Sequence, residues 1–256
     1  MRATSHRRLL GKGGPPAHLL RTGMANTYVL GRRRLVVVDP GAASSAGLVL
    51  DFVTQELGRK PADVSEIVVT HLHCDHIGGV AELAEATGAK VAMGRAARRY
   101  VEEGQAMRWA PLSRWLAMVA LWRGTDFRVP AFGDLVRMPW TGSPLSRRHH
   151  TPFRVTRWLE DGEPVAAEGW RVVSAPGHTD DSICLWAGQG RALISGDVVL
   201  GVHGRPLFNP FFAFDEAMSR TRARLGDLRP ARVLPGHGWP TPGFQSRAAS
   251  PPDAPP

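Results

Sequence analysis

The stretch THLHCDHIGG, residues 70–79, decides the fold, because it places three histidines and one aspartate within six residues. An apolar run at residues 67–70 predicts a short buried strand that ends where this loop begins. Imidazole and carboxylate groups are the ligands that zinc and similar metals prefer, and a loop can bring several of them to one point. Gly78 and Gly79 allow the backbone to turn closely into the next helix. We therefore predict a metal-binding loop with the ligands His71, His73, Asp75 and His76.

Three later segments repeat one pattern, in which an apolar strand runs into a glycine turn that carries a candidate ligand. They are VVSAPGH (residues 172–178), ALISGD (192–197) and RVLPGH (232–237). Strand ends with glycine turns are where α/β scaffolds place functional groups, although each turn alone is a common feature. Together with the first loop they supply five histidines and two aspartates, since they add His178, Asp197 and His237. This number fits two metal ions, each with three or four protein ligands and a shared water molecule.

The segments around these motifs alternate between strand and helix patterns. Residues 26–30 and 35–38 predict a β-hairpin, and a helix capped by Ser44 or Ser45 is expected to run to about residue 57. Further strands are expected at residues 90–93, 165–166, 170–175, 183–186, 192–195 and 232–234, and further helices at 80–87 and 215–228. The alternation indicates an α/β protein whose sheets are covered by helices.

Changes in composition divide the chain into segments. Residues 1–22 are interpreted as a polar N-terminal lead with little periodicity, and residues 23–240 as one domain. Within that domain the regular alternation of strand and helix patterns is interrupted at residues 95–163, a stretch rich in Arg and Trp. We interpret it as an inserted lid or cap with helical segments at 96–104 and 112–123. The Pro/Ala/Ser-rich residues 241–256 are expected to form a disordered tail.

Composition also excludes several classes of protein. Hydrophobic residues make up 43% of the chain, which is enough for a sizeable core and argues against global disorder. No apolar run approaches the roughly 20 residues of a membrane span, and no apolar segment follows the basic start, so a signal peptide is not expected. Cys74 and Cys184 do not make a disulfide framework. The expected location is the cytoplasm.

The net charge of +9 is concentrated in one segment. Residues 95–158 contain 12 arginines against four acidic residues, which leaves +8 of the total in this part of the chain. Much of the basicity therefore belongs to the insertion, and no DNA partner is expected. Residues 115–122 are apolar on nearly all faces and are bracketed by Arg114 and Arg123.

Several roles are open for the helical segment at residues 112–123. It is too short to span a membrane, but it could make a peripheral membrane contact, pack between the subunits of a homodimer, or form the wall of a substrate cleft. The alternative is an extra helix packed on the domain's own core. Next to so many arginines, we favour a lid over a small-molecule substrate, an acyl group attached to an anionic handle.

The ordered motifs of this chain resemble those of the metallo-β-lactamase superfamily from about residue 22 to residue 240. They are VVDPG (residues 37–41), the HxHxDH loop, and the later GHT, GD and PGHG motifs. The resemblance implies an αββα four-layer sandwich with two metal ions in a cleft along one sheet edge. It assigns His71, His73 and His178 to the first metal and Asp75, His76 and His237 to the second, with Asp197 between them. Asp39 would orient the ligand loop without touching metal.

We interpret the two metal ions as zinc, with iron or manganese as alternatives. Two such divalent ions can share a hydroxide that attacks an electrophile at neutral pH. Asp75 would orient that hydroxide and carry its proton, so no Ser or Cys nucleophile is needed. Cys74 is interpreted as a neighbour in the loop and Cys184 as a core residue. His149 and His150 are interpreted as a solvated pair.

The resemblance implies a dinuclear metal-dependent hydrolase rather than a true β-lactamase. Asp197 is similar to the bridging aspartate of hydroxyacylglutathione hydrolases, lactonases and nucleases of the superfamily, which true β-lactamases usually lack. Only 19 residues follow His237, which argues against a glutathione-binding domain, and His73 argues against oxygen chemistry. We expect attack on a carbonyl ester, thioester or lactone. The alternatives are a phosphodiesterase or endoribonuclease, because residues 176–182 and 194–201 resemble RNA endonucleases of this fold, and β-lactam hydrolysis as a side activity.

Overall fold

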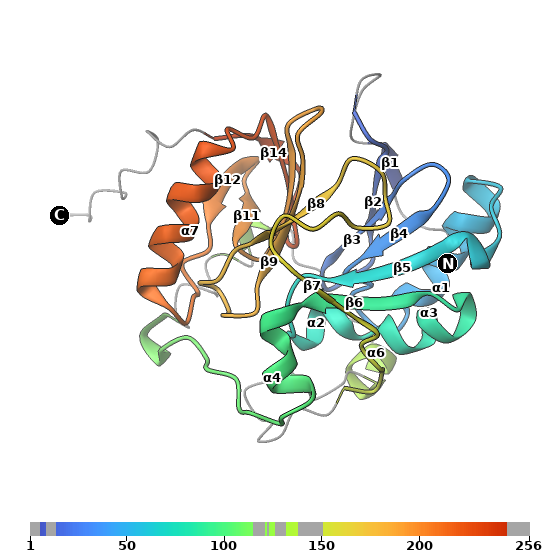
Figure 1. The fold of residues 1–256 in the computed structure, drawn as a ribbon, viewed down its shortest axis with the longest axis horizontal. Coiled ribbons are helices and arrows are strands. Elements are labelled where there is room, and N and C mark those ends of the chain that lie inside the picture. The colour runs from blue at the N-terminus through green and yellow to red at the C-terminus, as the bar shows by residue number, and fades with distance from the viewer. Residues whose placement is uncertain are drawn as a thin grey trace.

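The computed structural model describes residues 6–8, 14–114, 121, 123–125, 132–137 and 151–244. Two β-sheets pack face to face, and helices cover the outer face of each sheet, which gives four layers (Figure 1). The αββα sandwich that the resemblance implied is therefore confirmed. Within the described ranges, no helix has the length and hydropathy needed to cross a bilayer.

The first sheet is built from the N-terminal part of the chain, residues 6–159. Its order follows the sequence, with neighbouring strands antiparallel from β1 to β4 and parallel from β4 to β7. Its strands are β1 (His6–Arg8), β2 (Ala17–Arg21), β3 (Asn26–Leu30), β4 (Leu35–Val38), β5 (Val64–Val69), β6 (Lys90–Gly94) and β7 (Arg157–Leu159). The hairpin predicted from residues 26–38 is thus the pair β3–β4.

The second sheet comes from the C-terminal half. It has the order β14-β13-β10-β9-β8, in which β10 and β13 are parallel and the other pairs antiparallel. Its strands are β8 (Arg171–Ser174), β9 (Ile183–Ala187), β10 (Ala192–Gly196), β13 (Arg232–Pro235) and β14 (Thr241–Pro242). A separate hairpin, β11 (Val199–Val202) and β12 (Arg205–Phe208), follows β10 and was not predicted.

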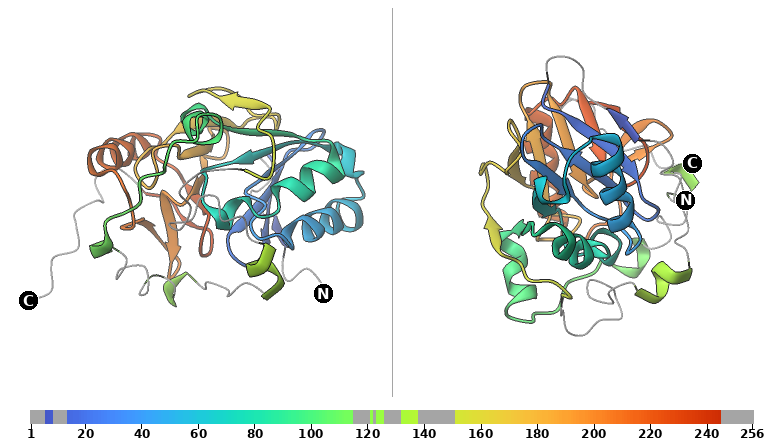
Figure 2. Two further views of the ribbon diagram at one scale, coloured as in Figure 1. Left: turned by 90° about the horizontal axis from the view of Figure 1, so that it is seen from below. Right: turned by 90° about the vertical axis from the view of Figure 1, so that its right-hand side faces the viewer.

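The helices form the two outer layers, as Figure 2 shows from two further sides. The first sheet is covered by residues of α1, η1, α3 and α4, and the second by α7. The helices are α1 (Ser45–Asp51), its π-helical continuation η1 (Phe52–Glu56), η2 (Pro61–Asp63), α2 (Cys74–Ile77), α3 (Val80–Thr87), η3 (Arg95–Ala97), α4 (Arg98–Val101), α6 (Phe132–Arg137) and α7 (Asp215–Asp227). Ser44 precedes α1, but its hydroxyl donates to Asp134 of α6 at 2.9 Å instead of capping the helix.

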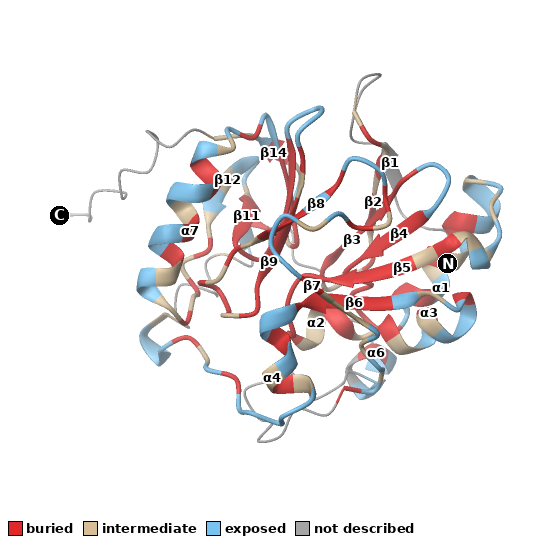
Figure 3. Ribbon diagram, in the orientation of Figure 1, coloured by how far each residue is buried: buried red, intermediate tan, exposed pale blue. Residues whose placement is uncertain are grey.

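The strands β3 and β4 are buried on both faces (Figure 3). In β4, Val36 and Val38 belong to the core between the sheets, whereas Leu35 and Val37 pack against the helices. Side chains of a strand alternate between its two faces, so a strand buried on both sides reads as a continuous apolar run. This is why the sequence contains runs such as LVVV, residues 35–38, and not a simple alternation.

Several elements differ from the sequence prediction. Residues 17–21, assigned to a lead without regular structure, form β2 and pair with β3, because the side chains of Leu19 and Leu20 are buried on opposite faces. Residues 157–159, assigned to the insertion, form β7 of the first sheet. Residues 165–166 form no strand, since only Pro164 bridges to Arg171 there.

The insertion is only partly described. Residues 112–114 are helical, and Leu112 is 81% exposed, while residues 115–120 and 122 of the predicted helix lie outside the described residues. His149, His150 and the last part of the predicted tail, residues 245–256, also lie outside them. The tail prediction began too early, because residues 241–242 pair with β13 as β14.

Candidate metal centre

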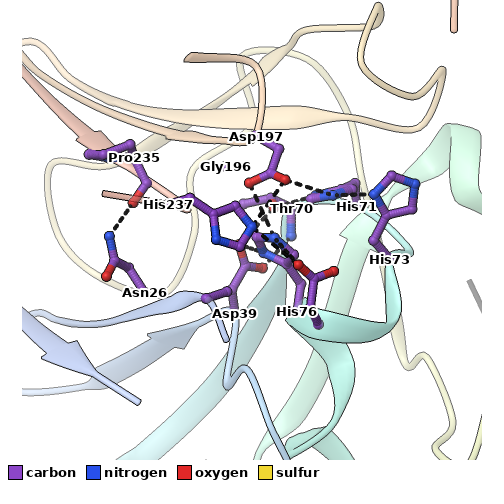
Figure 4. Close-up of polar contacts among 12 residues, drawn as sticks. Asn26, Asp39, Thr70, His71, His73, His76, Gly196, Asp197, Pro235 and His237 are labelled. Atoms are coloured by element: carbon purple, nitrogen blue, oxygen red, sulfur yellow. Dashed lines mark hydrogen bonds and ion pairs between the residues drawn. The ribbon is translucent and has the colours of Figure 1, made fainter. Parts of the chain in front are cut away.

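All seven predicted ligands lie at the ends of strands on one edge of the sandwich. The 71–76 loop follows β5, and the other three ligands follow β8, β10 and β13. Parallel strands bring their carboxyl ends to the same edge of a sheet, and here β4 with β5 and β10 with β13 are parallel. The structure therefore brings together side chains from both sheets (Figure 4).

The first group consists of three histidines and one aspartate, all buried. His73 Nδ1 lies 3.1 Å from His71 Nε2 and 3.1 Å from His178 Nε2. Asp197 Oδ2 lies 4.0 Å from His71 Nε2 and 3.7 Å from His178 Nε2. Each residue offers one donor atom, and these atoms all lie within 4.8 Å of one another.

The second group shares Asp197 with the first. His237 Nε2 lies 3.1 Å from Asp75 Oδ2 and 3.3 Å from Asp197 Oδ2, and His76 Nε2 lies 3.2 Å from Asp197 Oδ1. The membership of both groups agrees with the two ligand sets that the resemblance assigned. Asp197 is the one residue that belongs to both groups among those described.

The spacing of the donor atoms fits divalent metal ions. Four donors at about 2.1 Å from a tetrahedral zinc ion lie about 3.4 Å apart, and the donor pairs given above are 3.1 to 4.0 Å apart, with all donors of a group within 4.8 Å of one another. His76 Nε2 and Asp197 Oδ1 are also buried without making a hydrogen bond. The two atoms lie 3.2 Å from each other at the second group, so a cation bound there would contact both of them.

A short hydrogen-bond chain fixes the orientation of His71. The Thr70 hydroxyl donates to Asp39 Oδ2 at 2.7 Å, and the Thr70 backbone N–H donates to Asp39 Oδ1 at 2.8 Å. Because its only hydrogen goes to this carboxylate, the hydroxyl must accept from His71 Nδ1, which lies 3.0 Å away. The proton of His71 is thereby held on Nδ1, and Nε2 directs a lone pair into the first group.

Asp39 orients a second histidine in the same way. Its Oδ2 lies 2.9 Å from His76 Nδ1, so His76 Nε2 is directed into the second group. Asp39 is buried and adopts a positive φ of 50°, a conformation that costs energy for residues other than glycine but that Asp and Asn tolerate best. Asp39 has the outer position that the resemblance assigned to it.

His178 is held by residues that sequence reasoning missed. Its Nδ1 donates to the Phe211 carbonyl at 2.6 Å, and the Asn209 amide lies 3.2 Å from the same nitrogen. Since a carbonyl can only accept, Nε2 again carries the lone pair. The carbonyl contact has no signal in the sequence, because any residue type could supply it.

Other missed residues support the ligand-bearing turns. Asn26 donates through Nδ2 to the carbonyls of Pro235 at 2.9 Å and Gly238 at 2.7 Å, on either side of His237. Asp181 accepts from the Leu72 backbone N–H at 2.9 Å, between the first two histidines. Burial raises the pKa of Asp181 to about 6.

The PGH turn after β13 requires its glycine. A Cβ at Gly236 would lie 2.5 Å from Asp197 Oδ1 and 2.8 Å from His76 Cε1. Real Cβ atoms do not approach other atoms so closely, so only glycine lets this backbone pass behind the ligands. The glycine in the motif is therefore part of how the second group is assembled.

Electrostatics differ between the two groups. Burial lowers the pKa of His71 and His178, and it lowers that of His73 to about 3, so all three imidazoles are neutral at physiological pH. Neutral imidazole is the form that binds metal. In the first group the ligands are thus already in their metal-binding state.

In the second group the histidines hold protons. Burial alone would lower the pKa of His237 and His76, but the carboxylates of Asp197 and Asp75 outweigh it. The pKa of His237 is raised to about 10, and that of His76 well above its usual value. The pKa of Asp197 and Asp75 is lowered despite burial, mainly by these two histidines. Two carboxylates therefore face two cations, and a divalent cation could replace the two protons.

The cysteines are outside both groups, as the sequence analysis proposed. Burial, with a smaller effect from Asp75, raises the pKa of the Cys74 thiol to about 12. Cys184 lies in the core between the second sheet and α7. Cys74 offers no donor atom to either group, so the geometry gives it no part in ligation.

Comparisons with known proteins agree with this geometry. The chain is 28% identical over 253 residues to the probable metallo-hydrolase YflN of Bacillus subtilis, covering 90% of this chain and 87% of that protein. It is 28% identical over 182 residues to a hydroxyacylglutathione hydrolase of Bdellovibrio bacteriovorus, covering 70% of this chain and 49% of that protein. It is 42% identical over 182 residues to an atrochrysone carboxyl ACP thioesterase of Cryptosporiopsis, covering 70% of this chain and 39% of that protein. The chain thus spans less than half the length of the last two relatives.

The same family is found among solved structures. A metallo-β-lactamase of Cronobacter sakazakii with an HARLDQ motif superposes with a TM-score of 0.57 at 21% identity, covering 86% of this chain and 74% of that one. At this identity the likeness supports the fold alone. A family model described as the metallo-beta-lactamase superfamily matches residues 20–237. On this match, which spans both sheets and all seven clustered side chains, the chain belongs to the metallo-β-lactamase superfamily and is a metal-binding hydrolase.

Proposed function

We propose that the protein is a dinuclear metal-dependent hydrolase that cleaves a carbonyl ester, a thioester or a lactone. The observation that carries this proposal is the arrangement of seven donor side chains in two groups that share Asp197. A carboxylate common to both groups suits a bridge between two cations. A bridging aspartate would set the site apart from true β-lactamases, which the resemblance implies usually lack it.

The residues present suit zinc. His71, His73 and His178 would hold the first ion and Asp75, His76 and His237 the second, with Asp197 as the shared ligand. When bound, such ions polarise the electrophile and lower the pKa of a water molecule to about 7, which supplies a nucleophile at neutral pH. The protein then has to orient the ligands, exclude competing water and move one proton.

Asp75 is the residue that we assign to proton movement. Its side chain is 22% exposed, against 8% for Asp197, so it lies on the more open side of the cluster. Its Oδ2 lies 3.1 Å from His237 Nε2. An ionised carboxylate in this position can accept a hydrogen bond from water and hold it in one orientation.

Charge pairing in the insertion supports carbonyl chemistry over phosphodiester cleavage. A protein that binds a polyanion needs basic side chains that can contact phosphates. Six arginines of residues 95–163 already contact carboxylates of this chain: Arg95 with Glu160, Arg98 with Glu102, Arg99 with Asp180, Arg114 with Asp215, Arg137 with Glu82, and Arg157 with Glu66. Much of the local positive charge is thus neutralised within the protein. The thioesterase and hydroxyacylglutathione hydrolase relatives also support a carbonyl substrate.

The proposal is tested by turnover of zinc-loaded protein on acyl thioesters, lactones, a β-lactam and single-stranded RNA, at low and moderate salt. Asp75→Asn serves as the blank. Asp161→Asn is the matched control, since Asp161 is an aspartate that pairs with Arg224 at 2.6 Å instead of with the cluster. We expect thioester or lactone hydrolysis that the blank loses and the control keeps. RNA cleavage that disappears in the blank, without thioester or lactone turnover, would overturn the proposal.

A further inference from the structure

Residues 105–114, here called the strap, cross the protein beside the first group. Figures 1 and 2 show this green segment leaving α4 and running toward α7. On the strap, the indole of Trp109 stacks on the imidazole of His73, with ring centres 4.7 Å apart and planes 12° from parallel. Trp109 is half-buried. The insertion therefore contributes an aromatic surface directly at the candidate metal centre.

Arg114 fastens the far end of the strap to residues 212–215. Its Nη1 donates to the Phe212 carbonyl at 2.6 Å, and its Nη2 contacts Asp215 Oδ1 at 2.5 Å. Its guanidinium also lies 3.7 Å from the centre of the Phe212 ring. A planar guanidinium that makes two directed bonds and a ring contact fixes position more firmly than a single ion pair.

The segment that Arg114 contacts also supports His178. The Phe211 carbonyl accepts from His178 Nδ1, and the Ala213 backbone N–H donates to the Gly177 carbonyl at 3.0 Å. At Gly177 the backbone touches α7, because a Cβ there would lie 2.7 Å from Met218 Cα. The strap thus contacts His73 at its middle, through Trp109, and the segment that supports His178 at its end, through Arg114.

We propose that the strap forms the wall that selects the acyl part of the substrate, with Trp109 as the specificity-determining residue and Arg114 as the positioning residue that holds it in place. This inference rests on the proposed function. An indole offers a large apolar face at a small cost in conformational entropy, so the wall suits an aliphatic or aromatic acyl group better than a charged one. It lies beside the first group, where that acyl group would extend from the reacting carbonyl.

The anchoring role is tested without substrate, by hydrogen exchange in the zinc-loaded full chain. Arg114→Ala should raise exchange in residues 105–111 and 211–214. Arg224→Ala is the matched control, because Arg224 likewise contacts an aspartate, Asp161 at 2.6 Å, and a backbone carbonyl, that of Ser174 at 3.1 Å. The control should leave exchange in both segments unchanged. Unchanged exchange in Arg114→Ala overturns the anchoring role.

The selective role is tested with acetyl and octanoyl thioesters of one thiol. Trp109→Ala should lower kcat/KM for the octanoyl ester about tenfold through KM, and change it little for the acetyl ester, while Trp109→Phe keeps most of the preference. Arg114→Ala should act in the same direction. The double variant should lose no more than Trp109→Ala alone, because both changes act through one wall.

Two results would overturn the selective role. One is an equal loss on both esters together with loss of bound zinc, which would make Trp109 only a support for His73. The other is a wild-type protein that hydrolyses no acyl ester, which removes the proposed function and the selective role with it. Even then, the exchange measurement decides whether Arg114 anchors the strap.

Discussion

Replacing Asp39 with Asn should weaken the second metal group more than the first, because Asp39 contacts His76 directly but His71 only through the Thr70 hydroxyl. The carboxylate accepts three hydrogen bonds, from the Thr70 backbone and hydroxyl and from His76 Nδ1. Asn keeps the size of the side chain and tolerates the positive φ of 50°, so the backbone conformation at residue 39 should not change. Its amide has one accepting oxygen, so at least one of the three buried donors then faces an NH2 group.

The size of the effect follows from these contacts. An unsatisfied buried donor costs about 1–3 kcal/mol, and a hydrogen bond to a neutral acceptor is about 1 kcal/mol weaker than one to a charged acceptor. We therefore expect a loss of roughly 2–4 kcal/mol in the free energy of unfolding. With His76 no longer held, affinity at the second group should fall about 10- to 100-fold, as for other residues that orient metal ligands.

The assay is a competitive zinc titration with a chelating dye, which resolves two binding steps, combined with chemical unfolding. Thr70→Val is the companion variant. It removes the hydroxyl that accepts from His71 Nδ1, so it should weaken mainly the first group. Equal weakening of both steps in Asp39→Asn, or no weakening of either, would refute the reasoning from these hydrogen bonds.

Three further outcomes are expected. Asp197→Ala should abolish activity and lose at least one zinc ion by elemental analysis, because Asp197 is shared by both groups. The variant should keep its circular dichroism spectrum, because Asp197 lies on a turn. Two retained zinc ions with normal turnover would disprove the sharing. Cys74→Ser should keep zinc content and turnover, because Cys74 belongs to neither group of donor atoms, and loss of a zinc ion would contradict this. Zinc binding at neutral pH should release about two protons, from His76 and His237, because the pKa of both histidines is raised. The zinc affinity of the second group should therefore rise with pH up to about 10. Calorimetry in buffers of different ionisation enthalpy measures the proton release, and its absence would contradict the charge assignment.

The clustering of the seven candidate ligands could be predicted because their signals are local. Each follows a short apolar run that becomes a strand, and each later ligand follows a glycine that the turn requires, as Gly236 shows. Seven such residues in one order leave little choice of fold. The grouping into two sets came from the resemblance, and the structure has the same two sets.

The supporting residues could not be predicted because they act across long sequence separations. Asn26 holds the turn around His237 through backbone carbonyls, and the Phe211 carbonyl holds His178, so neither contact depends on a recognisable motif. The strands β2 and β7 were missed for a related reason. What makes each of them a strand is the neighbour with which it pairs, and that neighbour does not show in its own residues.

The two sheets come from consecutive parts of the chain, the first from residues 6–159 and the second from residues 171–242. Four of the seven donors belong to the first part and three to the second, and each group takes donors from both. A chain in which only the first part has folded therefore contains the whole HxHxDH loop but no complete group of either kind. Metal ions would bind tightly only after the two parts have docked, so metal uptake would report the last step of folding. Binding would also stabilise the correctly assembled sandwich over partly folded states.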